Sequence, residues 1–164
     1  MTRVAAIVFT VLLILPASAA HSADNPLVGT WKLKSYLREV AATGERYNER
    51  GEHPNGYLAY SADGRMYAII TWENRIAPRD VVPTNDERVK LFSTMISYAG
   101  TYTFDAEKVV HHVDISWNQN WTGTEQVRFY KLDGDTLTIT SAPTKNFTDG
   151  REGRSILVWE RLRP

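Results

Sequence analysis

The chain contains no cysteine, carries no excess charge of either sign and has only 4 histidines among its 164 residues. The lack of cysteine excludes disulfides, thiolate zinc sites and cysteine-based catalysis. Basic and acidic residues balance at 19 each, which argues against nucleic-acid binding because such proteins usually show a basic excess. The sequence has no repeat at solenoid periods and no low-complexity tract. Length and composition therefore indicate one globular domain that is stabilised by its hydrophobic core.

The N-terminus has the composition of an export signal. Arg3 precedes an apolar run over residues 4–15, and small residues follow at 17–20. This order is typical of a secretory signal peptide, whereas a membrane anchor needs about 20 apolar residues. We therefore expect residues 1–20 to be a cleaved signal peptide and residues 21–164 to form an exported domain. Its location would be periplasmic or extracellular, without stable membrane insertion.

The remaining sequence alternates between short β-strands and tight turns. From residue 27 to 38, an apolar face alternates with a polar face, which predicts a half-buried strand. The apolar face comprises Leu27, Gly29, Trp31, Leu33 and Leu37, and the polar face comprises Lys32, Lys34 and Arg38. Further strands are expected at 45–47, 56–60, 66–72, 101–104, 109–117, 125–131, 136–140 and 155–161.

These about eight to nine strands are joined by hairpins, which predicts an all-β, antiparallel up-and-down sheet. Because open sheet edges are costly, we expect the sheet to close into a barrel with room for one small ligand.

One α-helix is expected in the middle of the chain. Thr84 can cap it, and Glu87 completes a capping box three residues later. Apolar residues then recur at helical spacing as far as Ala99, and Gly100 suits a helix end. The helix is predicted either to plug one end of the barrel or to pack on its outside.

Several blocks together resemble the lipocalin-like domain family of bacterial and fungal barrel proteins, of calycin type. The blocks are 27–31, 56–60 with 63–64, 110–113, 120–124, 126–128, 132–137 and 157–161. They cover nearly all of the chain after the expected signal peptide. The resemblance implies a lipocalin-like barrel and structural roles for Gly29, Trp31 and an arginine that packs on Trp31. Arg161 is the first choice for this arginine and Arg128 the second.

Secreted animal lipocalins differ from this chain in two respects. The chain can form no disulfide, and its expected helix lies in mid-chain instead of following the last strand. Their transport roles therefore do not carry over directly.

Six residues are candidates for binding a ligand. Aromatic residues at strand ends can line a barrel mouth and suit a small ring-bearing ligand, although plain core packing is equally consistent with their positions. The strand at 125–131 has mixed residues on both faces, so its inward face stays open. If Gln126 and Arg128 face the cavity, they offer donors to a carboxylate, phenolate or carbonyl. The candidates are Tyr60, Trp72, His111, Trp117, Gln126 and Arg128.

The adjacent His111 and His112 cannot bind one metal together, because neighbouring strand residues point to opposite faces. His111 shares the apolar face of its strand, which predicts either a core histidine bonded to a neighbour or an imidazole that faces a ligand. The other histidines, His21 and His53, lie in expected loops, so neither a metal nor another cofactor is expected.

A catalytic triad of His112, Asp114 and Ser116 is not expected, although the three residues share one face of the strand. At a rise of about 3.3 Å per residue, successive members are about 7 Å apart. A proton relay needs contacts of about 3 Å.

Three functions stay open. The first, favoured by the barrel pattern and the lack of a strong catalytic constellation, is an exported protein that binds a small apolar or aromatic molecule. The second is a metal-free isomerase, cyclase or hydrolase of a polyketide-like or aromatic substrate, with His111 as acid–base group and Arg128 as oxyanion partner. The third is a structural or interaction domain without a ligand. A cavity of about 300 Å³ or more would favour the first, and a filled barrel the third.

Overall fold

The computed structural model describes residues 25–146 and 149–163, so the expected signal peptide lies outside the described residues. The strands are β1 (Gly29–Val40), β2 (Arg46–Tyr47), β3 (Asn55–Tyr60), β4 (Arg65–Thr71), β5 (Met95–Phe104), β6 (Lys108–Ser116), β7 (Glu125–Asp133), β8 (Thr136–Ser141), β9 (Thr144–Lys145) and β10 (Glu152–Arg161). The helices are α1 (Asn85–Ser93) and the short 3-10 helix η1 (Gln119–Trp121). Neither of these two helices is long and apolar enough to cross a membrane.

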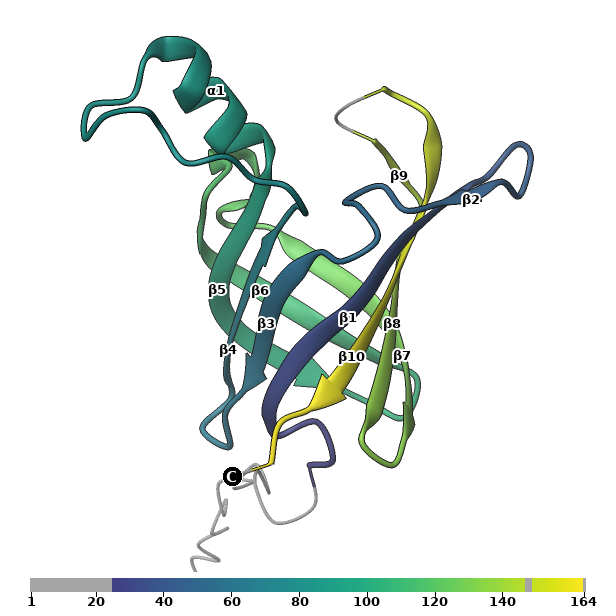
Figure 1. Cartoon of the computed structure of the whole chain (residues 1–164). Coiled ribbons are helices and arrows are strands. Elements are labelled where there is room, and N and C mark those ends of the chain that lie inside the picture. Colours follow the sequence, from purple (N-terminus) through teal and green to yellow (C-terminus); the bar gives the residue numbers. More distant parts are fainter. Residues whose placement is uncertain (1–24, 147–148, 164) are drawn as a thin grey trace, which may run out of the picture.

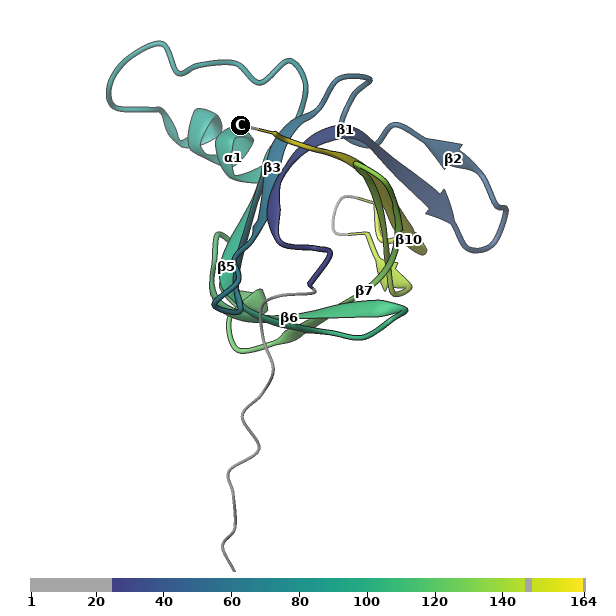
Figure 2. The same ribbon diagram turned by 90° about the horizontal axis from the view of Figure 1, so that it is seen from below.

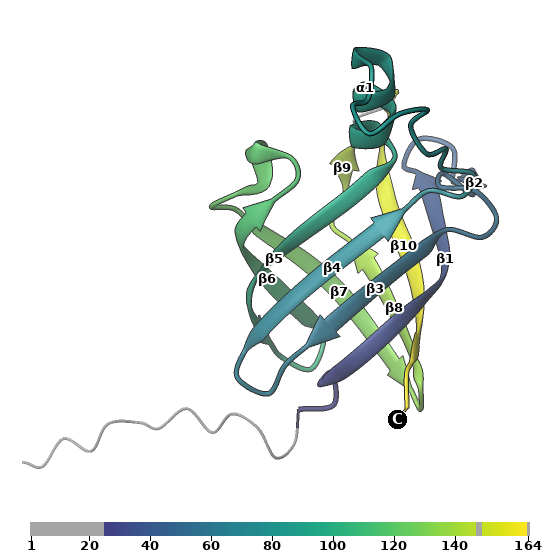
Figure 3. The same cartoon turned by 60° about the vertical axis from the view of Figure 1, so that its left-hand side comes forward.

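Eight strands form a closed antiparallel barrel (Figures 1 and 3). They are hydrogen-bonded in the order β1-β3-β4-β5-β6-β7-β8-β10, and β1 pairs with β10 to close the ring. The short strand β2 pairs with β1, and the short strand β9 pairs with β10, at the end that also carries α1, here called the open end. The opposite, closed end contains the start of β1. The predicted all-β up-and-down lipocalin-like barrel is therefore confirmed.

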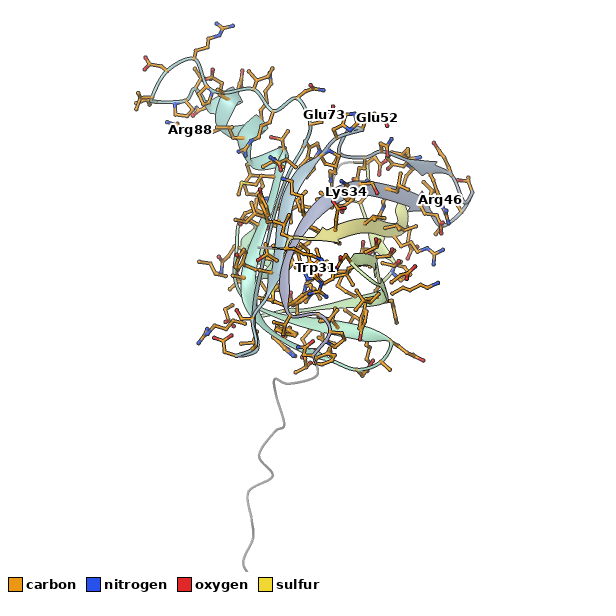
Figure 4. The ribbon with its side chains drawn as sticks, turned by 60° about the horizontal axis from the view of Figure 1, so that its bottom comes forward. Trp31, Lys34, Arg46, Glu52, Glu73 and Arg88 are labelled. Atoms are coloured by element: carbon orange, nitrogen blue, oxygen red, sulfur yellow. The ribbon has the colours of Figure 1, made fainter. Side chains whose placement is uncertain are left out.

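Residues 25–28 lead into β1 across the closed end, as the view along the barrel shows (Figure 2). Trp31 lies inside the ring of strands (Figure 4) and is fully buried. The Arg161 guanidinium lies 4.0 Å from the centre of the Trp31 ring and donates to the Pro26 carbonyl at 2.6 Å. A Cβ atom on Gly29 would come within 2.9 Å of this guanidinium. The closed end is thus held together by Arg161 of β10, which packs on residues 26–31, far from it in sequence.

Because of a β-bulge in β1, the predicted inward and outward faces of this strand are wrong beyond Lys34. The register with β10 shifts between Leu33 and Ser35, so that inward and outward positions exchange beyond Lys34. Arg38, expected outside, is only 4% exposed. Leu37, expected on the face of Trp31, lies on the opposite face and is half-buried. The prediction from alternating apolar and polar residues fails here, because one extra residue in the strand exchanges its inward and outward positions.

The helix is shorter than predicted. It begins at the expected capping box, in which Thr84 and Glu87 bond each other's backbone N–H groups, but it ends at Ser93. The segment from Met95 onward is strand β5, with its alternate residues buried between β4 and β6. Gly100 does not end a helix. It sits at a bulge in β5, where a Cβ atom would lie 1.9 Å from the His112 carbonyl oxygen.

Helix α1 lies outside the ring of strands at the open end, as the view along the barrel shows (Figure 2). None of its residues is buried. Its contact with the barrel includes Phe92, whose ring lies 6.2 Å from that of Trp117. Of the two predicted placements, packing on the outside is therefore the one observed.

Candidate functional site

A cavity of about 410 Å³ occupies the open half of the barrel. Its walls come from β1, β4, β5, β7, β8, β9 and β10, together with the connections that precede β3 and β7. The lining is mixed. Aromatic rings, arginines and small polar residues all line it. The cavity therefore has more polar groups than an apolar lipocalin-type pocket requires.

Two arginines line the cavity at one level of the barrel. Arg38 of β1 pairs with Ser155 of β10, the Ser155 backbone N–H donates to Ser141 Oγ at 2.9 Å, and Ser141 of β8 pairs with Arg128 of β7. All four residues line the cavity. We call this row across four neighbouring strands the arginine–serine belt.

Both guanidinium groups of the belt bond neutral acceptors. Arg38 donates to the carbonyls of Thr144 at 2.5 Å and Arg151 at 3.3 Å. Arg128 donates to the carbonyl of Val127 at 3.0 Å and to the side-chain oxygen of Gln126 at 3.3 Å. In the described part of the chain, no carboxylate forms an ion pair with either guanidinium.

A third arginine, Arg50, comes from the connection between β2 and β3 and is 2% exposed. It forms an ion pair of 3.2 Å with Glu49. Its guanidinium lies 3.7 Å from the ring centre of Trp72 and 5.0 Å from that of Tyr36. Such stacking stabilises a desolvated guanidinium. Trp72 therefore contacts Arg50, which in turn lines the cavity.

The connection that carries Arg50 is fixed to the segment that follows β4. The Glu73 carboxylate accepts hydrogen bonds from the backbone N–H groups of Glu52 at 2.7 Å and His53 at 3.2 Å. Glu52 and Glu73 lie side by side at the open end (Figure 4). Gly51 has a φ of 92°, and a Cβ atom there would collide with Glu73. These bonds hold Arg50 at the mouth of the cavity.

Three aromatic residues, Tyr98, Trp117 and Trp121, form an aromatic wall of the cavity. The rings of Trp117 and Trp121 meet edge to face at 5.0 Å, and Trp121 meets Tyr98 in the same manner at 5.4 Å. Trp121 belongs to η1, which Asn118 caps by accepting a bond from the backbone N–H of Asn120. Edge-to-face pairs leave ring faces available for a further ring to stack.

Beneath this wall, His111 lies in a buried network of tyrosines. Its Nε2 is 2.7 Å from Tyr60 Oη, and its Nδ1 is 2.9 Å from Tyr98 Oη. Burial, reinforced by the positive charge of Arg128, holds the pKa of His111 well below its ordinary value. Burial also raises the pKa of both tyrosines. The imidazole is therefore neutral, with one nitrogen donating and the other accepting.

The six predicted ligand-binding residues divide into two groups. Trp117, Gln126 and Arg128 line the cavity, which settles the inward face of β7. Tyr60 and His111 lie in the network beneath the cavity, and Trp72 packs on Arg50. That these residues bind a ligand stays a prediction.

Sequence reasoning missed Arg38 and Arg50. The bulge inverts the face on which Arg38 lies. Arg50 belongs to a polar connection whose path no periodicity reveals. The neighbouring opposite charges of Glu49 and Arg50 do not single them out, because the same loop-like segment also contains Glu45 next to Arg46.

On the outer face of β6, the hydrogen bonds of His112 go to residues of the neighbouring strands. His112 bonds Glu125 at 3.2 Å and Thr103 at 3.1 Å, both on neighbouring strands. Among the described residues, no group of three or more histidine, aspartate or glutamate side chains could hold a metal ion.

Comparison with known proteins agrees with this architecture. The chain is 29% identical over 87 residues to the 4'-hydroxy-3'-methoxypropiophenone carrier protein ppsC of Aspergillus oryzae, and the match covers 48% of this chain and 78% of that relative. The family model described as a lipocalin-like domain matches residues 28–162, from the start of β1 to just past the end of β10. The protein is therefore a member of the lipocalin-like domain family.

Proposed function

We propose that the protein is an exported carrier of a small, ring-bearing molecule. The observation that carries this proposal is the cavity of about 410 Å³, which falls within the size range of small-molecule sites. The rings of Trp117 and Trp121 suit a planar ligand. The Aspergillus relative, whose name describes it as the carrier of an aromatic ketone, supports the same class of ligand.

The contacts of His111 favour a carrier over an enzyme. A general base needs a nitrogen within hydrogen-bond reach of the substrate, but both nitrogens of His111 already bond tyrosine hydroxyls. Tyr98 lies between this imidazole and the cavity, since it both bonds His111 and lines the cavity. A substrate in the cavity would therefore meet Tyr98 and Arg128 before it met His111.

A domain without any ligand would need no open cavity. The closed end is filled by large side chains such as Trp31, Trp159 and Leu137, so the chain has the means to fill a barrel. It leaves the other half of its barrel open.

Export is the second part of the proposal. It rests on Arg3, the apolar run at 4–15 and the small residues at 17–20. Intact-mass analysis of the full chain, produced with its own N-terminus and separated into cytoplasmic, periplasmic and extracellular fractions, tests it. A mature species lacking about 19 or 20 residues outside the cytoplasm is expected. A full-length chain that stays in the cytoplasm would contradict export.

Native mass spectrometry of the protein purified from its own source tests the carrier proposal. A co-purifying small molecule is expected, lost on denaturation. Titration with aromatic ligands should also change tryptophan fluorescence, because Trp117 and Trp121 line the cavity. A Trp117→Phe, Trp121→Phe variant should lose most of that change, whereas Trp159→Phe at the closed end should keep it. An empty protein whose fluorescence does not respond would sink the proposal.

A further inference from the structure

We infer that the cavity binds a ring-bearing organic anion, with its carboxylate between Arg38 and Arg128 and its ring against Trp117 and Trp121. This inference rests on the proposed carrier function and names the chemical class of the ligand. It comes from the charge balance of the cavity and from the register of four neighbouring strands.

The charge balance of the cavity is strongly positive. Arg38, Arg50, Arg128 and Lys145 line it, and the only carboxylate among its described lining residues is Glu49, which pairs with Arg50. A guanidinium cannot lose its proton in a protein. Removing it from water costs free energy unless an opposite charge or strong acceptors compensate. An anion in the cavity would supply the missing negative charge.

Arg38 shows this lack of compensation most clearly. It is 4% exposed, lines the cavity and bonds only neutral oxygens of Thr144, Ser155 and Arg151 among the described residues. Arg128 likewise bonds the neutral Val127 carbonyl and Gln126 side chain. Charge-assisted bonds from a guanidinium to a carboxylate are shorter and about twice as strong as bonds between neutral groups.

The arginine–serine belt gives these charges a geometry suited to one compact anion. Ser141 and Ser155 stand on the two strands between the arginines. Three strand spacings of about 4.8 Å separate β1 from β7 along the wall, and both long side chains point inward from it. A carboxylate at the belt can therefore accept from a guanidinium on either side. Trp117 and Trp121 of the aromatic wall line the same cavity and can meet the attached ring.

A neutral ketone or ester would leave the positive charge of this site unbalanced. A carbonyl oxygen accepts hydrogen bonds but brings no charge to balance the buried guanidinium of Arg38 and the partly buried guanidinium of Arg128. Discrimination between an acid and its neutral ester is therefore the property that the belt predicts.

Isothermal titration calorimetry with matched pairs of compounds tests the inference. Benzoate, 4-hydroxy-3-methoxybenzoate and 4-hydroxy-3-methoxycinnamate are each compared with their methyl esters on the mature wild-type chain. We expect each acid that binds to bind about tenfold or more tightly than its ester, the effect of one or two charged hydrogen bonds. Added salt should weaken the acids more than the esters.

Arg128→Met is the diagnostic variant, because the guanidinium of the partly buried Arg128 bonds the Val127 carbonyl and the Gln126 side chain, lies beside the Tyr98 hydroxyl, and forms no ion pair in the described part of the chain. It should weaken acid binding about tenfold or more and leave ester binding almost unchanged. Arg65→Met is the matched control. Arg65 is an exposed arginine at the turn between β3 and β4, which pairs loosely with Asp63 at 3.8 Å. It should change neither affinity.

Arg38→Met removes bonds to the β9 segment and can unfold the open end, so Arg38→Lys accompanies it. The lysine keeps the charge and should retain part of the preference for acids.

The outcomes separate the two proposals. Esters that bind as tightly as acids, with Arg128→Met weakening neither, would overturn the anion site and leave the carrier proposal intact. If neither acids nor esters bind and tryptophan fluorescence is unchanged, both proposals fall. An aromatic acid that binds equally well to wild type and Arg128→Met would show a site elsewhere and overturn the belt.

Discussion

Arg161 joins the end of β10 to two other parts of the chain at the closed end of the barrel, the segment 26–31 and Asp135, with which it forms an ion pair of 3.6 Å. Its guanidinium covers the Trp31 ring at 4.0 Å and donates to the carbonyls of Val28 at 2.5 Å and Pro26 at 2.6 Å. It stands at the end of β10, far from these residues in sequence. Arg161 therefore fixes the segment that crosses the closed end.

Replacing Arg161 with methionine should cost about 2–4 kcal/mol of unfolding free energy, because one cation–π contact, two charged hydrogen bonds and the ion pair with Asp135 are lost. Denaturant unfolding of the mature chain measures this cost. Arg163→Met is the control, since Arg163 pairs with Asp135 at the exposed chain end, where ion pairs contribute about 0–1 kcal/mol. Equal losses in the two variants would contradict a special role for Arg161.

His111 should make the protein sensitive to mild acid. Burial holds the pKa of His111 well below 6.5 in the folded state, while the unfolded chain takes up a proton near pH 6.5. The unfolded state therefore binds more protons as pH falls below 6.5. Unfolding free energy should drop by up to about 1.4 kcal/mol per pH unit from this residue alone.

His111→Gln isolates this contribution, because glutamine does not titrate and still offers hydrogen bonds to Tyr60 and Tyr98. The variant should be less stable than wild type at pH 7.5, and the gap should narrow as the pH falls to 5. Urea unfolding at several pH values checks this. A gap that stays constant over this range would show that His111 titrates alike in both states.

At the scale of the elements, the sequence predicts strands well and their inward faces less well. The capping box at Thr84 and the hairpins follow from local chemistry, so they appear where expected. The faces fail where an extra residue enters a strand. Lys34 carries no signal that distinguishes a bulge from regular alternation, so the alternation predicts Arg38 on the outside. The arginine–serine belt depends on this bulge, so the hydrophobic periodicity of the sequence cannot predict the belt.

The helix boundary fails for a related reason. Residues 95–99 fit both a helical and a strand period, and pairing with two neighbouring strands decides for the strand. The local sequence does not reveal the stabilisation that residues 95–99 obtain from hydrogen bonds to both β4 and β6. Gly100, interpreted as a helix end, instead permits close approach of the β6 backbone.

Gly100→Ala should destabilise the barrel by roughly 1–3 kcal/mol, as overpacking does elsewhere. The new Cβ atom would lie 1.9 Å from the His112 carbonyl oxygen and force β5 and β6 apart. Thermal unfolding followed by circular dichroism measures the loss. Thr101→Ala, at the next and exposed position of β5, should change stability by less than about 0.5 kcal/mol. A Gly100→Ala protein as stable as this control would show that the bulge is not required.

At the scale of the whole molecule, the barrel divides by height into a packed half and an open half. Trp31, Leu137 and Trp159 fill the closed end, and the cavity with Arg38 and Trp117 occupies the open end. Burial of apolar area stabilises the first half. The second half retains buried charge, which costs free energy that a bound anion would offset.

This division predicts that stability and binding respond to different substitutions. Leu137→Ala, at a fully buried position of the closed end, should cost about 2–5 kcal/mol and leave the affinity for an aromatic ligand within about twofold. Trp117→Ala at the cavity rim should cost less stability, because Trp117 is only partly buried, and should weaken ligand binding about tenfold. Denaturant unfolding and calorimetry on both variants measure the two quantities together. If Leu137→Ala weakened binding as much as Trp117→Ala, the packed end would help to shape the site, and the barrel would act as one cooperative unit instead of two halves.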